Sequence, residues 1–156
     1  MSLLENHIVL ITGAGSGLGL GIAHYCKAQG ADVIVTDVST EKIQQLQSEF
    51  TDRDLLLTCD VTKISELEHC KQQILAKYAR LDAVIGAQGI FDGNVAIADM
   101  SAAHLDQLFD ELFHVNVKGY LLTAHIFADV LKANQGALVF TTSTAAYAAD
   151  GGGAVY

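Results

Sequence analysis

Ser143 and Tyr156 stand close to the end of the sequence, and a glycine-rich stretch, Thr12 to Gly19, stands near its start. A serine hydroxyl and a tyrosine phenol brought together by folding can orient a substrate oxygen and exchange its proton, the acid–base part of a hydride transfer. A glycine turn that opens a helix after an apolar strand offers backbone N–H groups and a positive helix end to a diphosphate. These residue types therefore favour oxidoreductase chemistry beside a bound dinucleotide.

Asp37 strengthens the prediction of a dinucleotide site. It ends a second apolar strand, and an acidic residue roughly 20 positions beyond the glycines is placed to accept hydrogen bonds from the adenosine ribose. Glycine-rich stretches also occur as ordinary loops, but this one follows an apolar run and precedes a helical pattern. Its spacing, Thr-Gly-x-x-x-Gly-x-Gly, differs from the common Gly-x-Gly-x-x-Gly.

The elements that must position these residues alternate between apolar strands and amphipathic helices. We expect strands over His7–Thr12, Asp32–Thr36, Leu55–Thr58, Ala83–Gly86 and Gly136–Thr142. We expect helices over Gly17–Gln29, Glu41–Glu49, Ile64–Tyr78 and, as one long helix, Ser101–Ala133. Strands joined by helical crossovers predict an α/β, Rossmann-type doubly wound parallel sheet, formed by residues 1–156 as a single domain.

Composition excludes several functional classes. The net charge of −9 and the pI near 4.8 disfavour nucleic acid as a partner, because that binding needs clustered Lys and Arg. The sequence has no apolar run of about 20 residues and no signal-peptide pattern at its start, so we expect no membrane partner and a cytoplasmic protein. Three cysteines without a Cys-x-x-Cys pair predict buried free thiols, and six histidines without ligand spacing predict no metal site.

From about Ile8 to Tyr156 the order of these motifs resembles the short-chain dehydrogenase/reductase family. The resemblance implies NAD as cofactor and five of the family's usual seven strands. It implies roles for the following residues: diphosphate binding by Gly13, Ser16, Gly17, Leu18 and Gly19, ribose binding by Asp37, adenine binding by Asp60 and Val61, largely main-chain contacts at Ala87 and Gly89, and catalysis by Asn116, Ser143 and Tyr156.

In the family mechanism the tyrosine takes the alcohol proton, the serine orients the substrate oxygen, hydride passes to the nicotinamide, and the asparagine holds a water. Each candidate here also has a purely structural explanation. Asn116 lies on an apolar helix stripe and suits a core asparagine bonded to backbone. Ser143 ends a strand, where serine often begins a turn, and Tyr156 alone suits a surface tyrosine.

Two segments, Phe109 to Tyr120 and Gly151 to Tyr156, are similar to bacterial cis-dihydrodiol dehydrogenases of aromatic-ring degradation. This similarity implies NAD-dependent oxidation of a small secondary alcohol or diol, with a cis-dihydrodiol giving a catechol. The alternative is a non-catalytic dinucleotide-binding unit or a truncated remnant that keeps the fold without the chemistry.

The sequence departs from the family pattern in two places. Gly86-Ala87-Gln88-Gly89 stands where the family has Asn-Asn-Ala-Gly, so we expect side-chain hydrogen bonds worth about 0.5–1.5 kcal/mol each to be lost, and stability to be lower. The family's lysine, which binds the nicotinamide ribose and activates the tyrosine, falls four positions past Tyr156. We therefore expect residues 1–156 alone to turn over little substrate. We also expect a homodimer or homotetramer, formed through the Gly136–Thr142 sheet edge and the Ser101–Ala133 helix.

Overall fold

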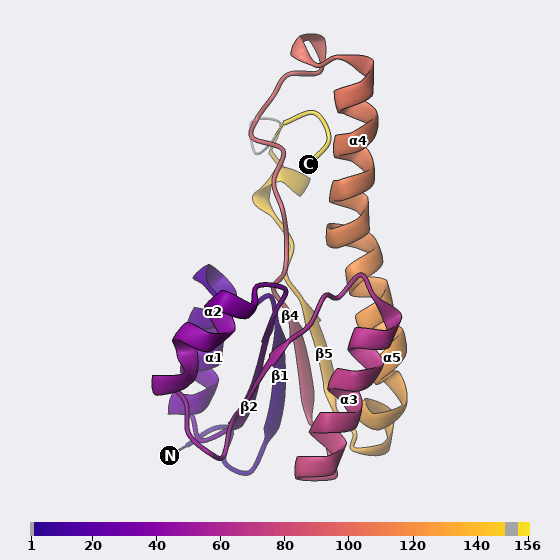
Figure 1. The fold of residues 1–156 in the computed structure, drawn as a ribbon. Helices are drawn as coiled ribbons and strands as arrows, with labels where there is room; N and C mark the ends of the chain where they lie inside the picture. Colours follow the sequence, from indigo (N-terminus) through magenta and orange to yellow (C-terminus); the bar gives the residue numbers. More distant parts are fainter. Residues whose placement is uncertain (1, 149–152) are drawn as a thin grey trace.

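A computed structural model describes residues 2–148 and 153–156 of the chain. Its centre is a parallel five-stranded sheet with the strand order β3-β2-β1-β4-β5 (Figure 1). The strands are β1 (Ile8–Thr12), β2 (Asp32–Asp37), β3 (Leu55–Thr58), β4 (Ala83–Gly86) and β5 (Ala137–Phe140). The sheet confirms the Rossmann-type α/β fold expected from the alternating pattern.

Helices cover both faces of this sheet. They are α1 (Gly17–Ala28), α2 (Thr40–Gln45), α3 (Ile64–Tyr78), α4 (Ala102–Phe113) and α5 (Gly119–Ala133). Figure 1 shows α1 and α2 on one face, α3 and α5 on the other, and α4 rising beyond the carboxyl end of the strands. Ser39 and Ser101 are the N-cap residues of α2 and α4. The side chain of each accepts a hydrogen bond from a backbone amide in the first turn of its helix.

The central strand β1 is buried on both sides, and its alternate residues enter two different cores. Leu10 packs with residues of α3 and α5, whereas Val9 and Ile11 pack with residues of α1. Full burial of such side chains stabilises the fold by about 1.5–3 kcal/mol each. The expected burial of the three cysteines is confirmed, since Cys26, Cys59 and Cys70 are buried free thiols.

The one long helix expected over Ser101–Ala133 is wrong in detail. A π-helical turn over His114–Lys118 separates α4 from α5. Smaller differences lie elsewhere: the fifth strand is shorter than Gly136–Thr142, and the helix expected over Glu41–Glu49 becomes α2 followed by a 3₁₀ turn at Leu46–Ser48. The π turn matters most, because such turns widen a helix locally and often occur at functional sites.

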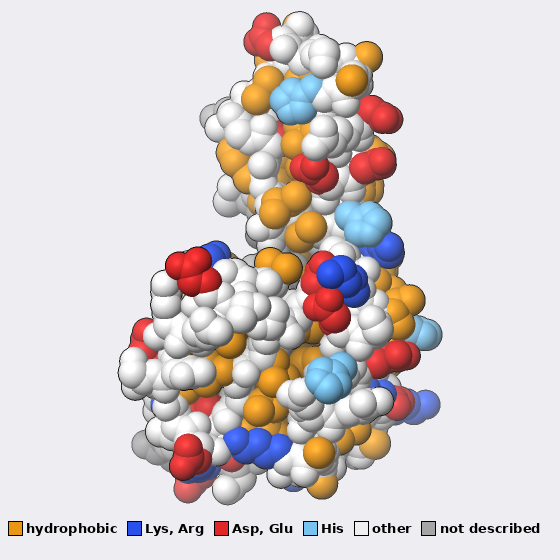
Figure 2. All heavy atoms as spheres, in the orientation of Figure 1, with side chains coloured by type: hydrophobic (Ala, Val, Ile, Leu, Met, Phe, Trp, Pro, Cys, Tyr) orange, Lys and Arg blue, Asp and Glu red, His pale blue; other side chains and the backbone are white. Residues whose placement is uncertain are grey.

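The upper part of the molecule, built from α4 and the segments beside it, joins the sheet through a narrow waist (Figure 2). The strand β5 forms one edge of the sheet, and its side chains Leu138, Val139 and Phe140 are 41%, 51% and 37% exposed. The sheet edge expected from the sequence is therefore present and apolar. Among the described residues, no helix has the length and apolar character to cross a bilayer.

Candidate functional site

The glycine turn after β1 is packed too closely to carry side chains. A Cβ on Gly13, whose φ is +67°, would lie 2.5 Å from the Gln88 backbone, and one on Gly19 would overlap the Gly13 carbonyl. The helix α1 begins at Gly17 after Ser16, whose side chain makes no capping bond to the first turn. The first helical amides therefore have no side-chain cap, which is the arrangement that binds phosphate oxygens.

Asp37, at the end of β2, supports this turn from the side. Its Oδ2 accepts a hydrogen bond from the Gly15 amide at 3.0 Å, and its Oδ1 accepts one from the Ser39 amide at 3.0 Å. A Cβ on Gly15 would lie 2.7 Å from the Asp37 carboxyl carbon, so the pair needs a glycine. An ionised carboxylate has further lone pairs, so Asp37 can still accept from ribose hydroxyls.

Asp60 follows β3 and is held by its neighbours. Its Oδ1 accepts from the Thr62 amide at 3.0 Å and from the Thr62 hydroxyl at 2.7 Å. Burial raises the pKa of the Asp60 carboxyl, but these bonds and the nearby Lys63 ammonium outweigh burial and hold the pKa below its usual range. Val61 packs against the start of α5, where a Cβ on Gly119 would lie 2.8 Å from the Val61 side chain.

These residues line a cleft of about 740 Å³ at the carboxyl ends of the strands. The strand order reverses between β1 and β4, and open α/β sheets bind ligands at such a reversal. Every cofactor residue expected from the sequence lines the cleft except Gly17. Sequence reasoning missed other lining residues, which include Lys42, Asp110, Glu111 and His114. Of these, Lys42 donates to the Ser16 hydroxyl at 3.0 Å. The two residues lie on different segments of the chain, so the local sequence pattern does not predict this contact.

The side-chain hydrogen bonds expected to be lost at the Asn-Asn-Ala-Gly position are replaced in part by contacts of Gln88 and Tyr120. The Thr12 hydroxyl donates to Gln88 Oε1 at 2.6 Å, and the Tyr120 hydroxyl donates to the Gln88 carbonyl at 2.7 Å. Position 86 requires a glycine, because a Cβ there would lie 2.5 Å from the Tyr120 ring. Gln88 and Tyr120 thus brace the ends of β1 and β4 in a way that the departure from the family pattern did not reveal.

Asn116 lies in the π-helical turn and binds the segment that follows β4. Its Oδ1 accepts from the Ile90 amide at 2.9 Å, and its Nδ2 donates to the Ile90 carbonyl at 2.8 Å. The backbone bonding that the structural explanation expected is therefore present, although Asn116 is only partly buried and does not lie in the core. The same side chain also lines the neighbouring pocket.

That second pocket, of about 480 Å³, brings together Asn116, Ser143 and Tyr156. It shares five lining residues with the larger cleft: Leu18, Ala87, Gln88, Gly89 and Ile90. The Ser143 Oγ accepts from the Ala145 amide at 3.1 Å, at the start of a 3₁₀ turn. The three catalytic candidates therefore line a pocket that adjoins the larger cleft.

Tyr120 and Phe91 line the same pocket and were not among the expected site residues. Burial first, and then the nearby Tyr156, raise the pKa of the Tyr120 hydroxyl, while its bond with Thr141 acts in the opposite direction. Of the glycine-rich segment before Tyr156, Gly151 and Gly152 lie outside the described residues.

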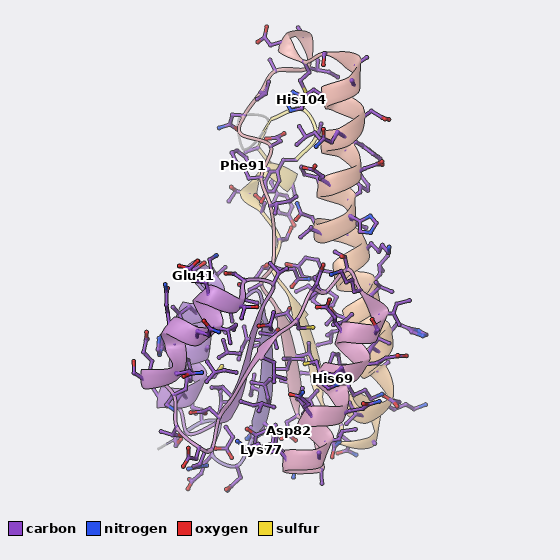
Figure 3. All side chains as sticks on the ribbon, viewed as in Figure 1. Glu41, His69, Lys77, Asp82, Phe91 and His104 are labelled. Atoms are coloured by element: carbon purple, nitrogen blue, oxygen red, sulfur yellow. The ribbon has the colours of Figure 1, made fainter. Side chains whose placement is uncertain are left out.

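Residues 2–148 and 153–156 contain no group of three or more His, Cys, Asp or Glu side chains that could hold a metal ion. Figure 3 shows two of the histidines well apart, His69 on α3 and His104 on α4.

Comparisons with known proteins agree with this geometry. The family model described as short chain dehydrogenase matches residues 7–156. The chain is 39% identical over 156 residues to the 3-phenylpropionate-dihydrodiol/cinnamic acid-dihydrodiol dehydrogenases of Escherichia coli O7:K1 strain IAI39 and strain K12/DH10B, and the match covers 100% of this chain and 58% of theirs.

A solved structure gives the same result at the level of the fold. The 3-ketoacyl-(acyl-carrier-protein) reductase of Brucella melitensis, solved in complex with NADH, superposes with a TM-score of 0.84 at 26% identity. The superposition covers 92% of this chain and 60% of that one. With a family match over almost its whole length, the chain belongs to the short chain dehydrogenases.

Proposed function

We propose that the whole protein is an NAD-dependent dehydrogenase that oxidises a cis-dihydrodiol of an aromatic-derived ring to a catechol. The observation that carries the proposal is the convergence of Asn116, Ser143 and Tyr156 on one pocket beside the cleft. Relatives named as dihydrodiol dehydrogenases, at 39% identity, support the substrate class. The chain spans 58% of the length of those relatives, so the activity is proposed for the whole protein.

The cleft fits a nicotinamide dinucleotide. Its volume of about 740 Å³, its glycine turn and the uncapped first turn of α1 suit a long ligand with a diphosphate at its middle. When bound, the cofactor supplies the hydride acceptor. Asp37 lines the cleft, and a carboxylate at the adenosine ribose accepts from two ribose hydroxyls but repels a 2′-phosphate. We therefore assign NAD rather than NADP.

Each catalytic candidate has a role that its contacts allow. Ser143 Oγ accepts from the Ala145 amide, which leaves its own O–H to donate to a substrate oxygen. Tyr156 takes the proton of the reacting hydroxyl as general base. Asn116 holds the segment at Ile90 in place through two hydrogen bonds, on the wall between pocket and cleft.

The walls of the pocket suit a flat carbon ring. Apolar side chains of Ile90, Phe91, Val117 and Ala146 line it, together with the polar candidates. Its volume of about 480 Å³ lies within the range of roughly 300–1,000 Å³ that small-molecule sites occupy. Because the product regains aromaticity, the chemistry itself drives oxidation of the diol forward.

The test is an assay of NADH formation by the whole protein, with residues 1–156 in parallel. The panel contains cis-dihydrodiols, simple secondary alcohols and 3-oxoacyl esters, the last assayed for NADH consumption. We expect turnover of the diols and a fall of about 10²–10⁴-fold in Ser143→Ala and Tyr156→Phe. Activity confined to the other two classes would refute the substrate, and NAD binding without any turnover would favour a non-catalytic dinucleotide-binding protein.

A further inference from the structure

Asp92, in the segment between β4 and α4, has a role that the mechanism above does not include. Asp92 is 5% exposed, and its carboxylate accepts hydrogen bonds from the amides of Gly153, Val155 and Tyr156. Oδ1 accepts from Gly153 at 3.1 Å, and Oδ2 accepts from Val155 at 3.2 Å and from Tyr156 at 3.0 Å. One buried side chain therefore holds the backbone that carries the proposed general base.

The fit between the two segments is close. A Cβ on Gly153 would overlap the Asp92 carboxylate, so the backbone can reach the carboxylate only because residue 153 is a glycine. The ring of Phe91 meets the ring of Tyr156 edge to face, with centroids 5.1 Å apart. Figure 3 places Phe91 on the segment above the sheet. Residues 91 and 92 thus fix both the ring and the backbone of Tyr156.

The Asp92 carboxylate accepts these hydrogen bonds in its ionised form. Burial raises the pKa of the Asp92 carboxyl, but four backbone hydrogen bonds, the fourth from the Asn94 amide at 3.1 Å, outweigh burial and hold the pKa below its usual range. Hydrogen bonds to an ionised acceptor are roughly twice as strong as those between neutral groups. Asp92 therefore stays charged at neutral pH and binds the amides tightly.

The same segment also carries the contact to Asn116. Ile90 exchanges two hydrogen bonds with the Asn116 carboxamide, and two residues later Asp92 accepts from the Tyr156 amide. Residues 90 to 92 thereby connect two catalytic candidates that lie far apart in the sequence.

We propose that Asp92 is a positioning residue that sets the place of Tyr156 in the active site. The inference rests on the proposed function for its kinetic consequence, but the contact itself does not depend on any substrate. A misplacement of about 1 Å can cost a reaction about 10²-fold, so loss of the carboxylate should lower kcat. Binding of NAD should not change, because Asp92 does not line the cofactor cleft.

The test uses Asp92→Asn and Asp92→Ala in the whole protein, with Asp99→Asn as a matched control in the exposed part of the same segment. The Asn variant keeps the shape but offers one acceptor oxygen and no charge. Hydrogen exchange by NMR should be at least about tenfold faster at the amides of Gly153, Val155 and Tyr156, and unchanged in the control. Unchanged exchange in both Asp92 variants would overturn the proposal.

Kinetics then separate positioning from a merely structural role. We expect kcat to fall about 10–100-fold in Asp92→Ala and less in Asp92→Asn, with an unchanged Kd for NAD and a changed acidic limb of the kcat–pH profile, where protonation of the general base lowers the rate. Faster exchange with an unaltered kcat and pH profile would show that the contact does not serve catalysis and would refute the role. If the wild-type protein oxidised no diol, the proposed function would fail, and the exchange data would still decide whether Asp92 holds Tyr156.

Discussion

At the scale of single residues, the site is organised by carboxylates that bind backbone amides. Asp37 holds the glycine turn through the Gly15 amide, and Asp92 holds the backbone of Tyr156. Each carboxylate follows a strand and accepts from a segment that lies elsewhere in the sequence. In each contact a single side chain fixes a loop by binding its backbone. We therefore expect loss of the carboxylate to change ligand affinity or reaction rate more than the fold.

Asp37 should decide the choice between NAD and NADP. A carboxylate about 4 Å from a 2′-phosphate costs up to ~4 kcal/mol at an effective dielectric near 20, and less with solvent screening. In Asp37→Ser we expect NADP to bind about 10–100-fold tighter and NAD to bind more weakly, as measured by calorimetry.

The nearby Lys42 gives this experiment its control. Lys42 lines the cleft together with Asp37 and donates to the Ser16 hydroxyl, so its ammonium can attract a 2′-phosphate that Asp37 no longer repels. Adding Lys42→Ala to Asp37→Ser should remove most of the gain in NADP affinity. Equal NADP affinity in the wild type and Asp37→Ser would contradict the assignment of NAD.

Thr12 and Gln88 should be energetically coupled. Thr12 is 1% exposed and its hydroxyl donates to Gln88 Oε1 at 2.6 Å, so Gln88→Ala leaves a buried hydroxyl without its acceptor and Thr12→Val leaves Gln88 Oε1 without its donor. We expect Thr12→Val and Gln88→Ala each to lower the free energy of unfolding, and the double variant to lose about 0.5–1.5 kcal/mol less than their sum. Urea unfolding of the four proteins measures this coupling, and strictly additive losses would show that the bond does not stabilise the fold.

At the scale of elements, Asp54 joins α1, β2 and the start of β3. It forms an ion pair with Lys27, and it accepts from the amide of Val33 at 3.1 Å and from the amide of Thr51 at 2.9 Å. Burial raises the pKa of the Asp54 carboxyl, but these hydrogen bonds together outweigh burial and lower the pKa below its ordinary value.

This lowered pKa gives a pH dependence with a definite sign. The group contributes stability above the unfolded pKa of about 3.9, and the contribution is lost as the pH falls through the lower folded value. Asp54→Asn should therefore lower the free energy of unfolding by about 1.5–3 kcal/mol at pH 7 and by less near pH 3. Urea denaturation of the wild type and Asp54→Asn at both pH values measures the difference in the free energy of unfolding. An equal difference at pH 7 and pH 3 would contradict this account.

The elements also show what could be predicted from the sequence. The residues Ile8 to Ile11 are all apolar and Thr12 alone is polar, so a doubly buried central strand follows from composition. The glycine turn, Asp37 and the catalytic candidates were found because each stands at a strand or helix end. The π turn was missed because no local pattern marks it; Asn116 lies in this turn and bonds to Ile90, which only the tertiary structure brings close.

The same reason explains the other residues that were missed. Asp92 and Tyr156 are 64 positions apart, and Thr12 and Gln88 are 76 apart, so no local pattern shows either contact. Gln88 was named only as a departure from the family pattern, with the expectation of lower stability. Its side chain accepts from Thr12 instead, so a residue that departs from a motif can restore part of the interaction that the motif supplied.

At the scale of the whole molecule, two apolar surfaces remain uncovered in the described chain. One is a helix stripe formed by Phe109, Phe113 and Leu121, which are 47%, 44% and 65% exposed. The other is the β5 edge, formed by Leu138, Val139 and Phe140. Contiguous apolar surface of this kind marks an interface, so we propose that the protein forms homo-oligomers through the helix stripe.

The proposal predicts how residues 1–156 sediment. Phe113 lies in the middle of the stripe and stacks on Phe109 with ring centroids 4.2 Å apart, so Phe113→Glu should place a charge at the centre of a copy-to-copy contact. Losing an aromatic anchor costs roughly 2 kcal/mol or more, which weakens association at least about 30-fold. Val139→Lys tests the β5 edge, and Ile64→Lys is the control, because Ile64 is 52% exposed at the start of α3.

Sedimentation velocity across a range of protein concentrations and salt decides between the two surfaces. The net charge of −9 makes copies repel, so added salt should strengthen association in the wild type and in Ile64→Lys alike. We expect Phe113→Glu to be a monomer where the wild type is a dimer or larger. If Val139→Lys alone dissociates the protein, the sheet edge is the interface, because a lysine on an edge strand blocks strand pairing and leaves the helix stripe unchanged. A wild type that stays monomeric at every concentration and salt would refute association through either surface.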